Sequence, residues 1–296
     1  MSSSITHPPL IAQLLRRYLL SNLRGRRRLT CFLAQNLKSL QAVPIAIADW
    51  PPVYVDLRCA TMHNWLIGHP WSSSPREPDE QAVLRRFVQS GDIVYDIGAN
   101  IGLHTALLSR LVGETGRVIA FEPNLELVTL LQKTFAQVNN TVLYPYALSD
   151  QATSSVLFVP THHPDVGSLG DWTQGEYGST HTVVCQQQRL DDLVKSEDLP
   201  HPDFIKCDVE GAELRVFQGA VETLNRVDAP IVLFEANVYT VRGLGIEHSA
   251  ATKFLTDLPM PKYRVFEVRS NGELSEEILL EKGGSNLLAI PASKLS

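Results

Sequence analysis

Three acidic side chains stand directly after short apolar runs of the kind that form buried β-strands. Asp96 follows I-V-Y, Glu122 follows V-I-A-F, and Asp208 follows F-I-K-C, a run that also contains Lys206. Charged groups seldom enter buried strands unless they are paired or have a chemical role. Since ligands bind outside the carboxyl ends of the strands in an open parallel sheet, we expect these side chains to surround one ligand site.

The first acid is followed by a turn with two glycines, D-I-G-A-N-I-G at 96–102, and then by a helical pattern. A dinucleotide site would need G-x-G-x-x-G, and this turn lacks the middle glycine. Asp96 would repel a pyrophosphate but suits a ligand with ammonium and sulfonium groups, and Glu122 can accept hydrogen bonds from two ribose hydroxyls. The pattern predicts S-adenosylmethionine as the cofactor. The alternative is that Asp96 caps a helix and Glu122 lies in a solvated loop.

A further part of this site is expected at Tyr146–Asp150, which we interpret as a turn after a strand at Thr141–Tyr144. A turn at the carboxyl end of a strand is placed to meet the adenine, unless it is a plain surface loop. The cofactor-binding residues predicted in this way are Asp96, Gly98, Ala99, Asn100, Gly102, Glu122, Pro123, Ala147 and Leu148.

The composition is that of an ordinary soluble protein, with 296 residues, 44% of them hydrophobic, and a formal net charge of −6. Residues 1–48 hold six arginines, one lysine and no acid, so the remainder carries −13, which argues against nucleic-acid binding. No apolar run approaches the ~20 residues of a membrane span. The scattered cysteines indicate a reducing compartment, and we expect a cytoplasmic protein, although the acid-free start also fits an organelle transit peptide.

The N-terminal residues 1–76 are expected to form an extension to a main domain at 77–296. Residues 10–40 have a helical pattern that Gly25 interrupts. The expected apolar side consists of Leu10, Leu14, Leu15, Tyr18 and Leu19. Basic helices of this kind usually pack on their own domain, which is our prediction; weak contact with a membrane surface or a docking partner is the alternative.

Residues 44–78 are rich in proline and contain Trp50, Trp65 and Trp71, so we expect an irregular cover with one strand near Val53–Leu57. The tryptophans either seal a core edge or line an acceptor pocket.

The main domain is predicted to alternate strands and helices, as an α/β fold requires. The expected helices cover 79–91, 103–111, 124–138 and the residues up to about 224. Besides those already named, the expected strands are 154–160, 180–186, 231–234, 264–268, 274–280 and 286–290, with a hairpin turn at Asn271-Gly272. The long segment 161–178 suggests a lid. We expect no metal there, because His162 and His163 have no cysteine or acid at ligand spacing.

Several short motifs together resemble the FkbM-type family of S-adenosylmethionine-dependent methyltransferases over about residues 77–236. They are D-I-G-A-N-I-G-L-H-T at 96–105, F-E-P-N at 121–124, A-L-S-D at 147–150, G-S-L at 167–169, I-K-C-D-V-E-G-A-E at 205–213 and L-F-E at 233–235. The resemblance implies a Rossmann-like class I methyltransferase fold, with a mostly parallel seven-stranded sheet that ends in an antiparallel hairpin. It also implies O-methylation of a sugar, polyketide or other small natural product. The motifs leave residues 1–76 uncovered, and Cys207 is a small departure from them.

The acceptor is therefore expected to be a small molecule or glycan, methylated by in-line displacement. Asp208 is our candidate for positioning or deprotonating the acceptor hydroxyl, Lys206 for holding Asp208 ionised or stabilising the alkoxide, and Glu210 for a supporting contact. The alternatives are a structural Lys206–Asp208 ion pair, and acids at Glu210 and Glu213 that only complement a helix dipole. For the whole chain, the alternatives are N-methylation and a non-catalytic binding module.

Overall fold

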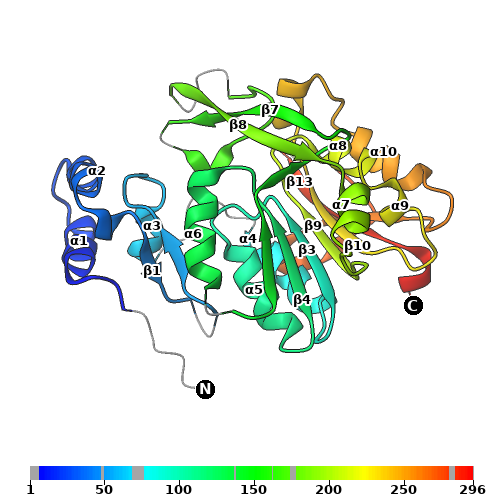
Figure 1. Ribbon diagram of the computed structural model, residues 1–296, viewed down its shortest axis with the longest axis horizontal. Coiled ribbons are helices and arrows are strands. Elements are labelled where there is room, and N and C mark those ends of the chain that lie inside the picture. The colour runs from blue at the N-terminus through cyan, green and yellow to red at the C-terminus, as the bar shows by residue number, and fades with distance from the viewer. Residues whose placement is uncertain are drawn as a thin grey trace.

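The computed structural model describes residues 7–47, 50–68, 77–136, 138–161, 163–173, 178–279 and 284–295. These residues form an α/β structure in which helices cover both faces of a central, mostly parallel sheet (Figure 1). The expected fold class is thereby confirmed. Three residues that carried predictions, Trp71, His162 and Leu280, lie outside the described residues.

Helices and strands follow the predicted alternation along most of the main domain. The helices are α1 (Leu10–Leu20), α2 (Arg26–Asn36), α3 (His63–Leu66), α4 (Glu77–Phe87), α5 (Leu103–Val112), α6 (Leu125–Phe135), α7 (Leu190–Ser196), α8 (Glu213–Gln218), α9 (Val221–Leu224) and α10 (Ala250–Asp257). The strands are β1 (Val43–Ile45), β2 (Val53–Val55), β3 (Ile93–Ile97), β4 (Arg117–Phe121), β5 (Thr141–Tyr144), β6 (Tyr146–Leu148), β7 (Thr153–Pro160), β8 (Thr180–Gln188), β9 (Phe204–Cys207), β10 (Ile231–Ala236), β11 (Arg264–Val268), β12 (Leu274–Ser275) and β13 (Ser285–Ile290). Short 3-10 turns lie at Lys38–Leu40, Pro164–Val166, Thr240–Leu244, Ser270–Gly272 and Ala292–Lys294.

The central sheet has the strand order β12-β11-β13-β10-β9-β3-β4-β5 within the described ranges. The strands from β10 to β5 are parallel, whereas β13 runs antiparallel between β10 and β11. The resemblance implied seven strands; the eighth is β12, an edge strand of two residues. The turn at Asn271-Gly272 connects β11 to β12 as predicted, with both residues at positive φ.

The expected turn at Tyr146–Asp150 is wrong for its first three residues. Tyr146–Leu148 form β6, which pairs in parallel with Gln186–Gln188 of β8. β7 pairs antiparallel with β8, which completes a separate three-stranded sheet. In Figure 1, β7 and β8 lie above the carboxyl edge of the central sheet. A local pattern does not reveal pairing with a strand this far along the chain, and this small sheet forms one wall of the site described below.

Alternation along the strands separates two buried faces. Val94 and Asp96 of β3 point to the face covered by α4 and α5, while Tyr95 and Ile97 point to the face covered by α7 to α10. Strands buried on both faces carry nearly continuous apolar runs, which explains why the sequence marked them clearly. The few polar residues in these strands consequently face into packed layers of the molecule.

The N-terminal extension packs on the main domain and shares its core. Val55 and Leu57 are fully buried in the same apolar cluster as residues of α4 and α5, and the backbone N–H of Tyr54 donates to Thr134 Oγ1 of α6. Trp50 and Trp65 are buried in this cluster, so they seal the core edge. None of the helices in the described part of the chain is long and apolar enough to cross a membrane.

The predicted apolar side of the first helix is partly wrong. Leu15 and Leu19 are buried against the rest of the chain, as expected, whereas Leu10 and Leu14 are 73% and 56% exposed. Residues 10 and 14 lie about half a helical turn around from residues 15 and 19, so they belong to a separate apolar row.

The shared core predicts that the extension unfolds together with the main domain. Replacing Leu57 by alanine should lower the free energy of unfolding by about 2–5 kcal/mol, because it opens a cavity in a fully buried site. Denaturation should be followed by tryptophan fluorescence, to which the extension contributes three of four tryptophans, and by far-ultraviolet circular dichroism. We expect the two transitions to coincide. Leu23→Ala, at a 60% exposed position, is the control and should change stability by less than about 0.5 kcal/mol.

Separate transitions, with only the fluorescence transition shifted by Leu57→Ala, would contradict a shared core.

Candidate active site

A pocket opens at the carboxyl ends of β3, β4 and β9 and is bounded on its other side by β6 and the segment around Pro164–Leu169. It encloses about 650 Å³, including its open mouth. Most of the predicted site residues line it, namely Gly98, Asn100, Glu122, Pro123, Ala147, Leu148, Asp208 and Glu210. The structure therefore gathers motifs that are far apart in the sequence around one cavity.

The glycine turn after β3 brings the backbone against the end of β9. Gly98 has a φ of +83°, and a Cβ at this position would lie 1.9 Å from the carbonyl oxygen of Asp208. Asn100 also has a positive φ, of 55°, which asparagine tolerates better than most residues. The turn thus presents backbone, with little side chain, to the pocket, which leaves room for a ligand beside it.

Glu122 is the most buried acid that lines the pocket, with 6% of its surface exposed. The backbone N–H groups of Asn100 and Asn124 each donate to one of its carboxylate oxygens, both at 2.8 Å. Burial raises the pKa of Glu122 to about 7, and those two hydrogen bonds oppose the rise. A carboxylate can accept about four hydrogen bonds, so both oxygens retain capacity for a ligand's hydroxyl groups.

Three of the predicted cofactor residues lie behind the pocket wall. Asp96 is fully buried, and its Oδ2 accepts a hydrogen bond from Thr105 Oγ1 at 2.5 Å. Ala99 packs in a small apolar cluster, and a Cβ on Gly102 would come within 2.6 Å of Leu131 on α6. Ala99 and Gly102 therefore shape the turn and its packing, and a direct ligand contact of Asp96 stays a prediction.

Lys206 and Asp208 form the predicted pair on one face of β9. Lys206 Nζ donates to Asp208 Oδ2 at 3.1 Å; Lys206 is 3% exposed, whereas the Asp208 side chain is 38% exposed at the pocket. Burial alone would lower the pKa of Lys206, but the negative charges of Asp208, Asp96 and Glu80 outweigh burial and raise it. The pair therefore presents a carboxylate to the pocket with a buried cation directly beneath it.

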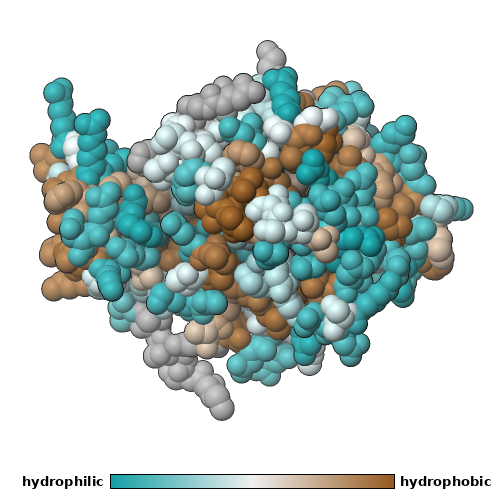
Figure 2. Space-filling model, turned by 45° about the horizontal axis from the view of Figure 1, so that its top comes forward, coloured by the Kyte–Doolittle hydropathy of each residue, from teal (hydrophilic) through white to brown (hydrophobic). Residues whose placement is uncertain are grey.

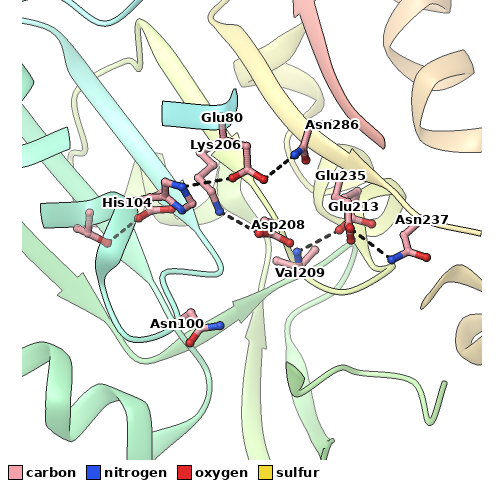
Figure 3. A network of polar contacts seen from close by, with 12 residues as sticks. Glu80, Asn100, His104, Lys206, Asp208, Val209, Glu213, Glu235, Asn237 and Asn286 are labelled. Atoms are coloured by element: carbon pink, nitrogen blue, oxygen red, sulfur yellow. Dashed lines mark hydrogen bonds and ion pairs between the residues drawn. The ribbon is translucent and has the colours of Figure 1, made fainter. Parts of the chain in front are cut away.

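A second group of polar side chains, from α4, α5 and β13, lies near Lys206 (Figure 3). Glu80 of α4 accepts a hydrogen bond at 2.5 Å from Asn286 Nδ2 of β13, and His104 Nε2 of α5 lies 3.3 Å from its other oxygen. Burial raises the pKa of Glu80 to about 7 and lowers that of His104 well below its usual range. No local sequence pattern indicated this group of side chains; the available signal was His104 within the helical part of the first motif.

The loop after Asp208 is held by hydrogen bonds to Glu213, the first residue of α8. Glu213 Oε1 accepts hydrogen bonds from the backbone N–H groups of Val209 and Gly211, at 3.0 and 3.4 Å. Burial raises the pKa of Glu213 to about 7 and that of neighbouring Glu235 well above its usual range. Glu213 therefore braces the backbone that carries Glu210, which adds a specific role to the helix-dipole alternative.

The segment after β7 also contributes to the pocket. Ser168 Oγ donates to the carbonyl oxygen of Glu210 at 2.7 Å, and Ser168 bridges to Phe158 of β7 through the backbone. This connection holds the G-S-L motif against the loop after β9. The motif carried no predicted site residue. Within the expected lid, Pro164, Gly167, Ser168 and Leu169 line the pocket and so form part of its wall.

Comparison with known proteins found one matching family model, that of the methyltransferase FkbM domain, over residues 96–258. Among curated proteins, the chain is 29% identical over 182 residues to the hexuronic acid methyltransferase AglP of Haloferax volcanii, which covers 60% of this chain and 68% of that protein. Similar solved structures include a precorrin-6y C5,15-methyltransferase of Geobacter metallireducens, with 13% identity, a TM-score of 0.42 and coverage of 72% of this chain and 88% of that one. Another is the Aeropyrum pernix fibrillarin with bound S-adenosyl-L-methionine, with 12% identity, a TM-score of 0.41 and coverage of 71% and 73%.

The buried acids predict a pH-dependent stability that can be assigned to one side chain. Because the pKa of Glu213 is raised to about 7 in the folded protein, the folded state binds more protons than the unfolded state between pH 4.5 and 7. The contribution of Glu213 to the free energy of unfolding is therefore fully present below pH 4.5 and is lost as the pH rises to 7. Glu213→Gln keeps an acceptor for Val209 and Gly211 and removes the titration, so urea denaturation across this interval should show a decline smaller by up to about 3 kcal/mol.

The control is Glu222→Gln, at a 66% exposed side chain, which should follow the wild-type pH profile. Identical profiles for the wild type and Glu213→Gln would contradict a raised pKa at this site.

Proposed function

The chain belongs to the methyltransferase FkbM domain family, and on this premise we propose that it transfers the methyl group of S-adenosylmethionine to an oxygen atom of a sugar or a related small molecule. The observation that carries this proposal is the position of Glu122. Its carboxylate lines the pocket, and backbone amides on both sides hold it in place.

The pocket residues fit the chemistry of this cofactor. Glu122 can accept hydrogen bonds from both ribose hydroxyls, and such donors would offset the desolvation that raises its pKa. Gly98 keeps the adjoining wall free of a side chain, and Ala147 and Leu148 of β6 offer an apolar surface for the adenine. When bound, S-adenosylmethionine supplies a methyl group made electrophilic by the sulfonium sulfur.

Asp208 is the side chain best placed to act on the acceptor. It lines the same pocket as Glu122, and its carboxylate reaches the surface while Lys206 holds it from below at 3.1 Å. A carboxylate in this position can orient an acceptor hydroxyl and take its proton during transfer. Lys206 contributes by fixing the carboxylate, and Glu210 by adding a polar group to the same wall.

A sugar acceptor is supported by the relative whose name specifies hexuronic acid. A hexuronic acid offers two kinds of oxygen, the ring hydroxyls and the carboxylate. Methylation of a hydroxyl requires loss of a proton, whereas an ionised carboxylate requires none. The position of Asp208 at the pocket favours a hydroxyl, so the proposed product is a methyl ether.

Labelled cofactor distinguishes these products. The protein should be incubated with methyl-labelled S-adenosylmethionine and either a neutral methyl glycoside, the corresponding uronide or an amino sugar, and the products analysed by mass spectrometry before and after mild alkali. A labelled ether survives alkali, and a labelled ester does not. Label on the amino sugar's nitrogen would support N-methylation. A parallel incubation with cell extract tests the remaining alternative, since absence of transfer to any extract component would support a non-catalytic module.

Cofactor binding should depend on the charge of Glu122. Glu122→Gln should weaken S-adenosylmethionine binding by about 1–3 kcal/mol, because a charged acceptor for the ribose is replaced by a neutral amide. Calorimetry on the folded variant measures this loss. Glu126→Gln, an exposed change in the first turn of α6, should bind like the wild type. Equal affinity of all three proteins would remove Glu122 from the cofactor site.

Methyl transfer should depend on Asp208 separately from cofactor binding. Asp208→Asn should slow single-turnover transfer by about 100-fold or more, the usual scale for lost acid-base assistance, with little change in cofactor affinity when both are measured below the variant's melting temperature. Asp192→Asn, at a 51% exposed side chain on α7, is the control. Normal turnover by Asp208→Asn would make the pair structural, and the base should then be sought between residues 162 and 177.

A further inference from the structure

Large apolar side chains are exposed along the first two helices and the turn between them. They are Leu10 (73% exposed), Leu14 (56%), Leu20 (51%), Leu23 (60%), Leu29 (45%) and Phe32 (61%). Single exposed leucines are ordinary on a protein surface, but six within one short segment form a patch. Figure 2 shows hydrophobic residues interspersed with hydrophilic ones on this N-terminal part, at the left of the molecule.

Each helix has two distinct sides. In α1, Ala12, Leu15 and Leu19 pack inward, while Leu10 and Leu14 form an outward row that continues to Arg17 at helical spacing. These outward leucines remain mostly exposed, whereas the inward row is buried. The outward side of α1 is therefore free for an external contact.

α2 repeats the arrangement. Thr30 and Ala34 are buried, whereas Arg28 and Phe32 lie one turn apart on the opposite side with Leu29 beside them. The two helices contact one another and form the outer edge of the molecule in Figure 1. We call the outward residues the N-terminal face: Leu10, Leu14, Arg17, Leu20, Leu23, Arg24, Arg28, Leu29 and Phe32.

The arginines of this segment divide into two groups. Arg16, Arg26 and Arg27 donate to backbone or side-chain oxygens and so hold the extension together. The arginines of the N-terminal face, 17, 24 and 28, make no hydrogen bond or ion pair with any residue that the structure describes. Residues 1–48 contain no acid, so no carboxylate of this segment offsets these charges.

We propose that the N-terminal face binds the surface of a lipid bilayer that contains anionic headgroups. Helices that lie in the membrane interface bury leucine and phenylalanine in the acyl boundary. Arginines beside these residues have side chains long enough to bring the cation to the anionic headgroups. A nucleic acid would leave the leucines without an apolar environment, whereas a bilayer surface offers an anionic layer and an apolar layer side by side. The mixture of single leucines with arginines lacking partners therefore fits a lipid surface best.

The charge distribution also orients the molecule. The chain beyond residue 48 has a formal charge of −13 and would be repelled by the same membrane, so only the N-terminal face attracts it. This attraction acts within about 10 Å at ordinary salt and weakens as salt is added. The contact is independent of the proposed methyl transfer, since the N-terminal face contributes no residue to the pocket.

Binding of the full chain to vesicles tests the proposal. Vesicles of phosphatidylcholine alone and vesicles that also contain phosphatidylglycerol should be sedimented with the protein at low and at high salt. We expect binding to the anionic vesicles that decreases at high salt and little binding to the neutral vesicles. No binding to anionic vesicles at low salt overturns the proposal.

Charge variants show whether the arginines carry the attraction. The triple variant Arg17→Gln, Arg24→Gln, Arg28→Gln should lower the partition coefficient roughly 100-fold, at roughly fivefold for each charge near the surface. The matched control removes three exposed charges elsewhere, by Arg117→Gln, Lys253→Gln and Lys262→Gln. An equal loss in both variants would mean that only net charge matters and would overturn the proposal.

Apolar variants test insertion. Leu10→Ser, Leu14→Ser and Phe32→Ser together should reduce binding at least tenfold at unchanged melting temperature, because all three side chains are exposed. Val227→Ser, Met260→Ser and Leu279→Ser form the control, at comparably exposed positions. Unaltered binding by the first triple would overturn the proposal. So would concentration-dependent dimerisation that the first triple abolishes in the absence of lipid, since a second copy would then be the occupant of the N-terminal face.

Discussion

A buried positive charge sets the arrangement of the site. Lys206 is 3% exposed in the middle of a central strand, where an unpaired ammonium would cost several kcal/mol of folding free energy. Three carboxylates on different elements attract this charge: Asp208 beyond the end of β9, Asp96 on β3, which pairs with Lys206 in register, and Glu80 on α4. Their attraction outweighs burial and keeps Lys206 charged. The relative positions of α4, β3 and β9 are therefore part of one electrostatic arrangement, and Asp208 reaches the pocket as its outermost member.

Within the described residues, acidic side chains near the pocket outnumber the single buried cation, Lys206. Burial raises the pKa of Glu80, Glu122 and Glu213 to about 7 in each case, so each is easier to protonate than an exposed acid. Their hydrogen-bond partners differ: Asn286 for Glu80, and backbone amides for the other two. The donors to Glu122 and Glu213 are backbone N–H groups of neighbouring loops, so these carboxylates stabilise the loops and preserve the shape of the pocket as well as contributing charge.

Sequence patterns located the strand ends and the turn after β3 because their signals are local. The site residues there follow apolar runs directly, and positive-φ glycine marks the turn itself. Pairing across the chain was not predictable in this way, as the strand at Tyr146–Leu148 and the contact of Glu80 with His104 show. The outward row of α1 was assigned to the wrong side because leucine spacing alone fits two apolar rows, and only packing shows which is buried.

The pocket has one wall built from strand ends of the central sheet and another built from a segment outside that sheet. This difference affects how an acceptor could be selected. The half with Gly98 and Glu122 is fixed by neighbouring strand ends in parallel register, so its geometry follows from the sheet. The opposite half depends on the segment that Ser168 joins to the loop of Glu210, outside the central sheet. A change around Ser168 can alter the acceptor side while the central sheet stays in place. A change at Pro164 would also affect Asn124, which holds Glu122, because Asn124 Nδ2 donates to the carbonyl oxygen of Pro164 at 3.3 Å. In the proposed enzyme, acceptor choice can therefore vary at the connection between Ser168 and Glu210, while cofactor binding rests on the strand ends together with Ala147 and Leu148 of β6.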